Sequence, residues 1–418
     1  MAAAVVAARA GMQVTVLEAQ DRVGNSIKVT GDGRCNIANA GTCADVYRNA
    51  DFVARAFDAF SPADALAFLE SLGLVLRKEG EGRLYPLTNK ATSVIDALRL
   101  AAGNAGVEER CSMRVRSLRK VESGGKEPAW RLDIEGEAPL YFDKVVLACG
   151  GGFNGKLLPR GLPIHDSKPL LGPLATETEP LRGLDKTRVK CELAANGHIE
   201  VGEVTFRSYG LSGIAAFNMT RHVAPGDVVS MKFLPGWTEG EASEFMRQRL
   251  ARLQAQTWLD FTCGLFLPLV ARALLRAVGL RPDDPPNARD LPALTEMALR
   301  FPLRVEGIGD KRLCQVHRGG IDVDVLDPAT MQIRCHPGLF AAGEMLDVDG
   351  PCGGYNLHWA WVSGVIAGAA ASGQELSSLH AGDSEALRAS KREAGGGELD
   401  GVAASRGLGA HTRKGHTA

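Results

Sequence analysis

The sequence contains no continuous apolar run approaching the roughly 18–20 residues that a membrane-spanning helix needs. Its formal net charge is only −1, so we expect neither nucleic acid nor a membrane surface as a partner. The first eleven residues are largely apolar, but no basic segment precedes them and Arg9 interrupts them. We therefore expect them to form a helix rather than a secretory signal peptide.

Paired cysteines are also lacking. The nine cysteines are scattered along the chain, their number is odd, and no two have C-x-x-C spacing. This pattern argues against a disulfide framework and favours the reducing cytoplasm. No cluster of His, Cys and Asp has the spacing of metal ligands, so we expect no metal site. The sequence does not indicate an oligomeric state.

A third absence concerns the glycine-rich loop of a dinucleotide site. Residues 2–10 predict a helix closed by Gly11, and residues 13–18 predict a buried strand that ends in Glu18. This is the second half of a βαβ dinucleotide-binding unit, in which the strand-end acid accepts hydrogen bonds from ribose hydroxyls. No strand and no G-x-G-x-x-G loop precede Ala2. We expect a gap in the sheet and an incomplete pyrophosphate cradle.

Residues 338–371 carry the strongest pattern that is present. Residues 339–342 predict a short buried parallel strand, followed by a glycine-rich loop and a run with helical spacing. Small residues recur at every fourth position of that helix, at Ala360, Gly364 and Gly368. They predict close packing against a sheet. A strand, a glycine-rich loop and a helix N-terminus together predict a site for an anionic ligand.

The character of the chain changes in its middle. Residues 45–75 have helical periodicity, whereas short alternating segments after residue 168 predict an antiparallel barrel or sandwich. The tail is rich in Gly, Ser and Ala, and we expect it to be disordered. The expected divisions are a discontinuous first domain at 1–167 and 329–375, a β-barrel insertion at 168–237 and 301–328, a helical insertion at 238–300, and the tail at 376–418.

Several segments resemble one family, the FAD-binding flavoproteins grouped with aminoacetone oxidases and the bile-acid reductase BaiN. They are VTVLE (14–18), TGDGRCNIAN (30–39), GRLYPLTNKATSV (82–94), VVLACGG (145–151), GEVTFRSYGLSG (202–213), GG with DPATM (319–331) and GLFAAGEMLDVDGPCGGYNLHWAW (338–361). The resemblance implies an α/β fold: a discontinuous Rossmann-like FAD domain with barrel-like and helical insertions. It also implies a bacterial FAD-dependent oxidoreductase, an enone-like or other small organic substrate, and NAD(P)H as a possible transient hydride donor.

The resemblance further implies which residues bind FAD. It places one loop along the ribityl and isoalloxazine groups, and this loop contains Gly31, Gly33, Arg34, Cys35 and Asn36. Arg34 either binds the pyrophosphate or supports the loop, and we interpret Cys35 as a packing residue. The Val115 backbone is placed at the adenine, although from sequence alone a core valine is the better interpretation. The residues Ala148 and Gly150 are placed on the same wall.

The final group of implied cofactor residues lies in the 338–371 segment. After Gly343, Glu344 resembles the strand-end acid that accepts from a ribityl hydroxyl. The residues that open the following helix are Gly353, Gly354, Tyr355, Asn356 and Leu357. Their backbone N–H groups are expected to meet the N1–C2=O edge of the flavin, where the reduced ring carries negative charge.

No catalytic acid or base can be named from the sequence. Tyr209 is a candidate only because its YGLSG loop could face the flavin, and a turn residue is the preferred interpretation. Four further residues fit packing roles better than catalysis, namely Cys352, His358, Trp359 and Trp361, whereas both roles stay open for His317. Two alternatives to the enzyme stay open. One is a truncated or degenerate flavoprotein homologue without FAD binding or activity, and the other is a nucleotide-binding structural module.

Overall fold

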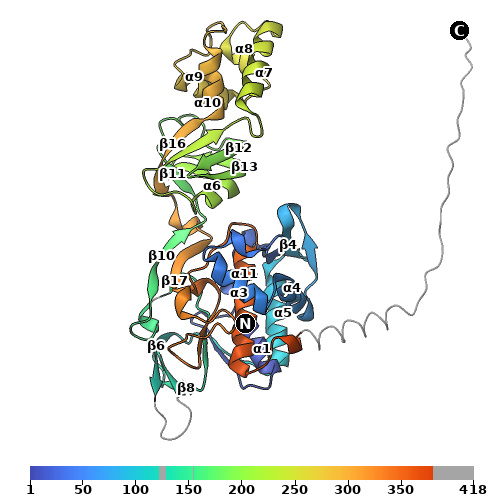
Figure 1. Ribbon diagram of the computed structural model, residues 1–418, viewed down its shortest axis with the longest axis vertical. Helices are drawn as coiled ribbons and strands as arrows, with labels where there is room; N and C mark the ends of the chain where they lie inside the picture. Colours follow the sequence, from blue (N-terminus) through green and yellow to red (C-terminus); the bar gives the residue numbers. More distant parts are fainter. Residues whose placement is uncertain (122–128, 154, 380–418) are drawn as a thin grey trace, which may run out of the picture. The chain divides into compact units, whose positions relative to one another are not determined.

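The computed structural model describes residues 1–121, 129–153 and 155–379, and Met1–Leu376 forms one compact unit (Figure 1). The tail predicted to be disordered lies outside the described residues from position 380 onward. The helices of the predicted first domain are α1 (Ala2–Arg9), α2 (Asn25–Lys28), α3 (Ala50–Ala59), α4 (Pro62–Ser71), α5 (Ala91–Asn104) and α11 (Tyr355–Ser372).

The parallel strands occur in two separate pairs. In one pair β1 (Thr15–Leu17) is hydrogen-bonded to β5 (Glu108–Arg110), and in the other β9 (Val145–Leu147) is hydrogen-bonded to β18 (Leu339–Ala341). No hydrogen-bonded ladder between described residues joins the two pairs. β18 is buried along its whole length, whereas β1 is half-buried. Among the described residues, the parallel strands thus form two separate two-stranded sheets.

Helix α11 packs against helix α1, and this corrects one expectation about its small residues. A Cβ atom added to Gly368 would lie 2.5 Å from the carbonyl oxygen of Ala3, and one added to Gly364 would lie 3.3 Å from Cβ of Ala2. At Gly364 and Gly368 the stripe of small residues therefore allows α11 to approach helix α1, whereas Ala360 lies near Gly343 at the end of β18, so only part of the stripe packs against the sheet as expected. Helical Cβ atoms of ordinary size would separate the backbones.

The run from 45 to 75 is not one helix. α3 ends at Ala59 and α4 begins at Pro62, because Ser61 forms a capping box with Asp64. The Ser61 Oγ accepts a hydrogen bond from the Asp64 N–H at 3.2 Å, and Asp64 Oδ2 accepts one from the Ser61 N–H at 2.9 Å. Such a box satisfies N–H groups that a new helix leaves open.

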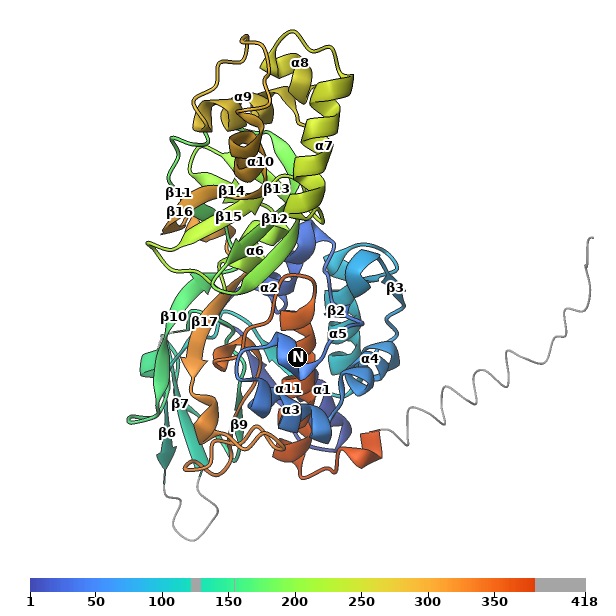
Figure 2. The same ribbon diagram turned by 45° about the horizontal axis from the view of Figure 1, so that its top comes forward.

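Two small antiparallel sheets complete the predicted first domain. The first has the order β2 (Ala38–Asn39), β4 (Arg83–Pro86) and β3 (Leu76–Lys78), and the second has the order β6 (Val115–Val121), β7 (Ala129–Ile134) and β8 (Leu140–Phe142). The side-by-side strands β10 (Ile164–Leu170) and β17 (Val316–Ile321) form a further antiparallel pair (Figure 2).

The inserted sheet is a closed barrel. Its order is β11 (Leu174–Thr176), β14 (Gly210–Ser212), β13 (His198–Arg207), β12 (Arg188–Ala195), β15 (Val228–Lys232) and β16 (Phe301–Ile308). A short helix, α6 (Ile214–Met219), packs on β13. β12 and β16 alternate between buried and more exposed positions, as a barrel wall with one apolar face requires.

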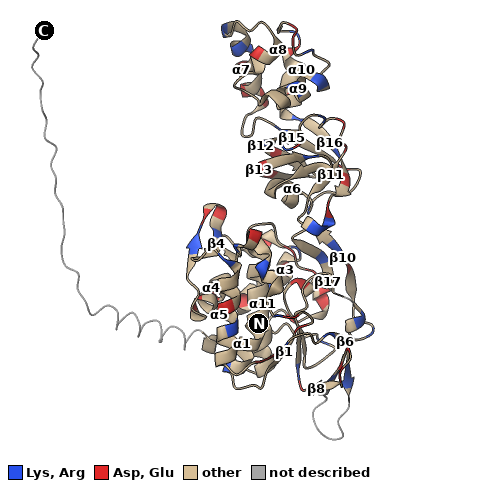
Figure 3. Cartoon of the chain, turned by 180° about the vertical axis from the view of Figure 1, so that it is seen from behind, with Lys and Arg blue, Asp and Glu red and all other residues tan. Residues whose placement is uncertain are grey.

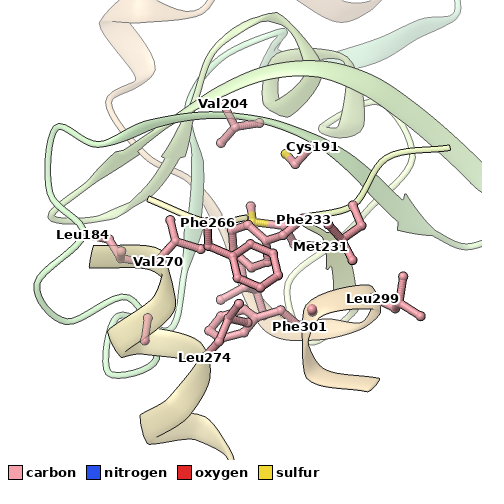
Figure 4. Close-up of a cluster of buried hydrophobic side chains, with 14 of the residues drawn as sticks. Leu184, Cys191, Val204, Met231, Phe233, Phe266, Val270, Leu274, Leu299 and Phe301 are labelled. Carbon is pink, nitrogen blue, oxygen red and sulfur yellow. The ribbon is translucent and has the colours of Figure 1, made fainter. Parts of the chain in front are cut away.

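The helical insertion contains α7 (Glu239–Arg252), α8 (Trp258–Thr262), α9 (Pro268–Ala277) and α10 (Leu291–Leu299). Capping boxes start two of these helices, at Thr238 and at Thr257. The helices share one apolar core with the barrel, in which Leu274 of α9 lies with Met231 and Phe301 of the barrel strands (Figure 4). Burial of this common core stabilises both insertions together.

Candidate flavin site

The Gly31–Asn36 loop turns sharply because several of its residues have left-handed backbone conformations. Gly31 has φ 55° and Gly33 has φ 76°, and Cys35 shares this region with φ 57°. A Cβ at Gly31 would lie 2.9 Å from the backbone nitrogen of Asn36, so glycine is required there. Cys35 is fully buried, and burial raises the pKa of its thiol to about 11. This environment agrees with a packing role for Cys35.

Arg34 is held by protein groups on both sides of its guanidinium. Its Nε donates to Asn89 Oδ1 at 2.7 Å, and its Nη2 donates to Glu79 Oε1 at 2.6 Å. The guanidinium also lies 4.3 Å from the centre of the Tyr85 ring. Of the two roles left open for Arg34, this geometry favours support of the loop.

Asn36 places an acceptor without a partner beside the N-terminus of α11. Its Oδ1 is buried, and no hydrogen-bond donor among the described residues reaches it. A Cβ at Gly354 would lie 2.8 Å from this oxygen and 2.3 Å from the carbonyl oxygen of Ala38. A buried orphaned acceptor is costly unless a ligand satisfies it. The residues present therefore fit a ligand with an N–H group, such as the flavin ring.

Hydrogen bonds from the Asn356 side chain of α11 hold the loop that precedes this helix. Asn356 Oδ1 accepts from the Gly350 N–H at 2.8 Å, and its Nδ2 donates to the Gly350 carbonyl at 3.0 Å. Gly353 and Gly354 have φ 120° and 97°, and no side chain caps the first turn of the helix. The N–H groups at Tyr355 to Leu357 therefore lie at an uncapped helix end, which favours negative charge on a bound group.

Glu18 lies at the end of β1 next to the start of α1. Its Oε1 accepts from the Gln20 N–H at 2.9 Å. Burial lowers the pKa of the Met1 α-amino group, while the charges of Glu109 and Glu18 oppose that shift, so both acids face the start of α1. The Met113 N–H donates to the Glu18 carbonyl at 2.8 Å, which brings the strand with the half-buried Val115 to the same place.

Glu344 is joined to the loop that follows β9. Its Oε1 accepts from the His317 N–H at 2.7 Å and lies 3.4 Å from His317 Nδ1. A Cβ at Gly151 would lie 2.2 Å from the same oxygen. The hydrogen bond that the His317 ring donates to the Glu344 carboxylate raises the pKa of His317. Gly151, the residue after the predicted wall residue Gly150, thus lies against Glu344, and His317 joins a site to which sequence reasoning did not assign it.

Gly343 fixes the turn between β18 and this acid. Its N–H donates to Ser363 Oγ at 2.9 Å, and its carbonyl accepts from Trp359 Nε1 at 3.3 Å. Both partners lie on α11, so the turn and the helix form one unit. Its φ of 75° is the left-handed conformation that glycine adopts without strain.

A buried charge cluster was missed by sequence reasoning. Asp347 and Asp349 are 2% and 1% exposed and lie in the DVDG segment before the uncapped helix end. Arg48 Nε donates to Asp347 Oδ2 at 2.9 Å, while Arg221 and Arg318 both donate to Asp349. The cluster ties this loop to the N-terminal helices, the barrel and β17. The DVDG motif contains the two acids, but their arginine partners are far away in the sequence, so the motif alone does not indicate the cluster.

The remaining candidate residues make packing contacts and hydrogen bonds to the backbone, which are typical of residues with a structural role. Tyr209 packs on Gly309, and its carbonyl accepts from the Thr176 N–H at 3.0 Å, as a turn residue does. His358 is buried, which lowers its pKa, and its Nε2 lies 3.0 Å from the Pro62 carbonyl oxygen. Trp361 donates through Nε1 to the Ile37 carbonyl at 2.9 Å.

The described residues contain neither a cluster of metal ligands nor a membrane-spanning helix. Within residues 1–121, 129–153 and 155–379, no three His, Cys, Asp or Glu side chains converge as metal ligands. No helix in the same ranges is both long and apolar enough to cross a membrane.

The fold and the site define a Rossmann-type flavoprotein. The model of the HI0933-like protein Rossmann domain matches residues 1–370, so the chain belongs to that FAD-binding family. The predicted fold class is thereby confirmed. The individual cofactor contacts and the domain boundaries remain predictions, as does the finer assignment to aminoacetone oxidases.

Two curated relatives cover nearly the whole chain. The 3-dehydro-bile acid delta(4,6)-reductase of Clostridium scindens is 31% identical over 399 residues, which are 88% of this chain and 96% of that protein. The ribosomal RNA dihydrouridine synthase of Escherichia coli K12 is 28% identical over 379 residues, 86% of this chain and 92% of that protein.

Among solved structures, a 3-ketosteroid-delta4-(5alpha)-dehydrogenase of Rhodococcus jostii RHA1 aligns with a TM-score of 0.44 and 14% identity, covering 89% of this chain and 94% of that chain.

Proposed function

We propose that the chain is an FAD-dependent reductase of a carbon–carbon double bond conjugated to a carbonyl. The names of the two relatives support this chemistry, because a delta(4,6)-reductase and a dihydrouridine synthase both add hydrogen across such a bond. In a 3-dehydro-delta(4,6) bile acid the double bonds are conjugated to the 3-oxo group, and in uridine the C5=C6 bond is conjugated to a ring carbonyl. Hydride addition suits both because the carbonyl accepts the displaced electron pair.

The observation that carries the proposal is the orphaned Asn36 Oδ1 beside the uncapped N-terminus of α11. When FAD is bound, it supplies the hydride chemistry. The chain's own residues would hold it: Asn36 would accept from an N–H of the ring, and the first turn of α11 would stabilise negative charge on the reduced ring. Glu18 and Glu344 would orient the ribose and ribityl hydroxyls.

A small molecule suits this chain better than RNA. The formal net charge is −1, and the charged ends of α7 have opposite signs, with Glu239 and Glu241 in its first turn and Arg249 and Arg252 in its last turn (Figure 3). An RNA-binding surface carries an excess of basic residues that neutralise phosphates. NAD(P)H is the proposed hydride donor. It would bind transiently, since the sequence has no second dinucleotide fingerprint.

The alternative is that the chain folds but does not retain FAD and has no reductase activity. The separate pairs β1–β5 and β9–β18 favour it, because a divided sheet contributes fewer fixed groups to a pyrophosphate. A colourless purified protein that FAD does not stabilise would support this alternative.

The test mixes purified, FAD-loaded protein anaerobically with NADPH or NADH and then with a 3-oxo-delta(4,6) bile acid. We expect bleaching of the flavin absorbance and its return when the bile acid is added, with a product that has gained two hydrogens. Ribosomal RNA containing uridine is the second probe. If neither probe reoxidises the flavin, the proposed function is wrong.

A further inference from the structure

Asn218 connects the barrel to the loop that opens the candidate flavin site. It is buried on α6, and its Oδ1 accepts a hydrogen bond from the Cys352 N–H at 2.8 Å. Its Nδ2 donates to Glu200 Oε2 on β13 at 3.1 Å. These two bonds fix the orientation of the amide. A single side chain thus separates the Glu200 carboxyl from the residue that precedes Gly353.

Glu200 is half-buried where several elements meet. The groups that act on its charge are Asn218 of α6, Arg221 just after α6, His198 on its own strand and Glu81 from the turn before β4. Burial raises the pKa of Glu200 and Glu81 adds to the rise, whereas Asn218, Arg221 and His198 oppose it, and the net direction is upward. A carboxyl of this kind holds its proton at higher pH than an exposed one.

The β4 turn reaches the same loop from its other side. Asn39 Nδ2 donates to the Gly353 carbonyl at 2.9 Å and to the Glu81 carbonyl at 3.1 Å. The charges of Glu200 and Arg83 both act on the buried Cys352 thiol, although burial is the main cause of its raised pKa. Polar groups from the barrel and from the β4 turn therefore converge on residues 352–354.

We propose that Glu200 is the proton donor of the reduction and that Asn218 positions it, an inference that rests on the proposed function above. Hydride from FAD reduced by NAD(P)H adds to the β carbon of the C=C–C=O unit and moves the π electrons onto the carbonyl oxygen. The Glu200 O–H then gives its proton to the α carbon, and the C=O bond re-forms. The substrate gains two hydrogens, and the Glu200 carboxylate takes a proton back from water.

The geometry explains why a carboxyl would be held by an amide here. Asn218 can donate to Glu200 whether that carboxyl is protonated or ionised, since one carboxyl oxygen always remains an acceptor. The other oxygen is left to carry the proton. Because Asn218 is also bonded to the Cys352 N–H, the carboxyl keeps its position relative to the flavin loop during the proton transfer.

The first experiment compares Glu200→Gln with Glu203→Gln, which alters an exposed acid on the same strand. Stopped-flow absorbance separates flavin reduction by NADPH from flavin reoxidation by the 3-oxo-delta(4,6) bile acid. We expect Glu200→Gln to slow substrate reduction by roughly 100-fold, within the range of general acid catalysis. Flavin reduction and FAD content should stay at the wild-type level, and Glu203→Gln should change neither step.

The pH profile supplies a second readout. In the wild-type protein the rate of substrate reduction should fall as pH rises through the raised pKa of Glu200, and this limb should vanish in Glu200→Gln. Asn218→Ala should move the limb without abolishing the reaction.

A third readout does not depend on turnover. Difference infrared spectra of the wild-type protein should show a protonated carboxyl band that persists above the ordinary pKa of glutamate. That band should be absent from Glu200→Gln and present in Glu203→Gln.

The outcomes separate the two proposals. A wild-type protein that reduces the bile acid, with Glu200→Gln equally fast or with an unchanged pH profile, overturns the role of Glu200 and leaves the proposed function in place. Equal slowing of both half-reactions also overturns it, since that result indicates a structural role. A wild-type protein with bound FAD that reduces neither probe overturns both proposals.

Discussion

Arg318 and Asp349 form a bidentate ion pair between β17 and the loop that leads into α11. Arg318 Nε donates to Oδ2 of Asp349 at 2.8 Å, and its Nη2 donates to Oδ1 at 2.9 Å. Arg221 Nε donates to the same Oδ1 at 3.0 Å. Burial alone would raise the pKa of Asp349, but the two guanidinium groups outweigh it and hold that pKa below its ordinary value.

Replacing Asp349 with asparagine should destabilise the protein strongly. Removal of one member of a buried ion pair leaves charges without a partner, at a cost of about 3–5 kcal/mol. Chemical denaturation followed by circular dichroism measures this loss. Asp310→Asn is the control, because Asp310 pairs with the exposed Arg312 and its loss should change the unfolding free energy little. Equal effects of the two substitutions would contradict a special role for the buried cluster.

The same pair predicts how stability depends on pH. The folded-state pKa of Asp349 is lowered, so its contribution is fully present above the unfolded-state pKa of the carboxyl. That contribution should be lost as pH falls through the unfolded-state value toward the folded one. Denaturation midpoints measured from neutral to acid pH should therefore fall more steeply in the wild-type protein than in Asp349→Asn. Parallel curves would rule out this linkage.

Gly368→Ala should separate α11 from α1. The added Cβ would lie 2.5 Å from the Ala3 carbonyl oxygen, a backbone atom that cannot move away alone. We expect a loss of about 1–3 kcal/mol, the usual cost of overpacking. Gly103→Ala is the matched control in α5, where no atom lies within 4 Å of the new Cβ. That change should stabilise the helix by up to about 1 kcal/mol. A Gly368→Ala protein as stable as wild type would show that the helices are not in close contact.

Asn36→Leu should weaken FAD binding without weakening the fold. Asn36 Oδ1 has no donor among the described residues, so its removal takes no protein hydrogen bond away. The lost bond to the cofactor is worth about 1–3 kcal/mol, roughly a 5- to 150-fold rise in Kd. Isothermal titration of the apoprotein with FAD measures the affinity, and thermal unfolding of the same apoprotein measures stability. A variant that loses stability but binds FAD normally would place Asn36 in the core instead.

Local sequence signals predicted much of the nucleotide-binding part. The apolar run at Leu339–Ala341, the glycine-rich loop and the helix after it were readable because each depends on neighbouring residues. The division between α3 and α4 was missed, although Ser61 and Asp64 carry the S-x-x-D spacing of a capping box. Periodicity across that point hid the signal.

Contacts between residues that are far apart in the sequence could not be predicted from local patterns. The DVDG acids could be read as polar loop residues, but their partners Arg48 and Arg221 lie 299 and 128 residues away. The partner of the α11 small-residue stripe was predicted only in part, since glycines indicate a close approach but not whether a helix or a strand makes it. Glu200 was not selected because a single acid in an alternating strand carries no local signature.

The most direct test of the account is the absorbance spectrum of the purified chain, with the FAD-to-protein ratio measured after the cofactor is released. If the chain binds FAD as proposed, the protein should be yellow, carry one FAD per chain and unfold at a higher temperature when FAD is present. A colourless protein whose thermal unfolding does not change when FAD is added would contradict it.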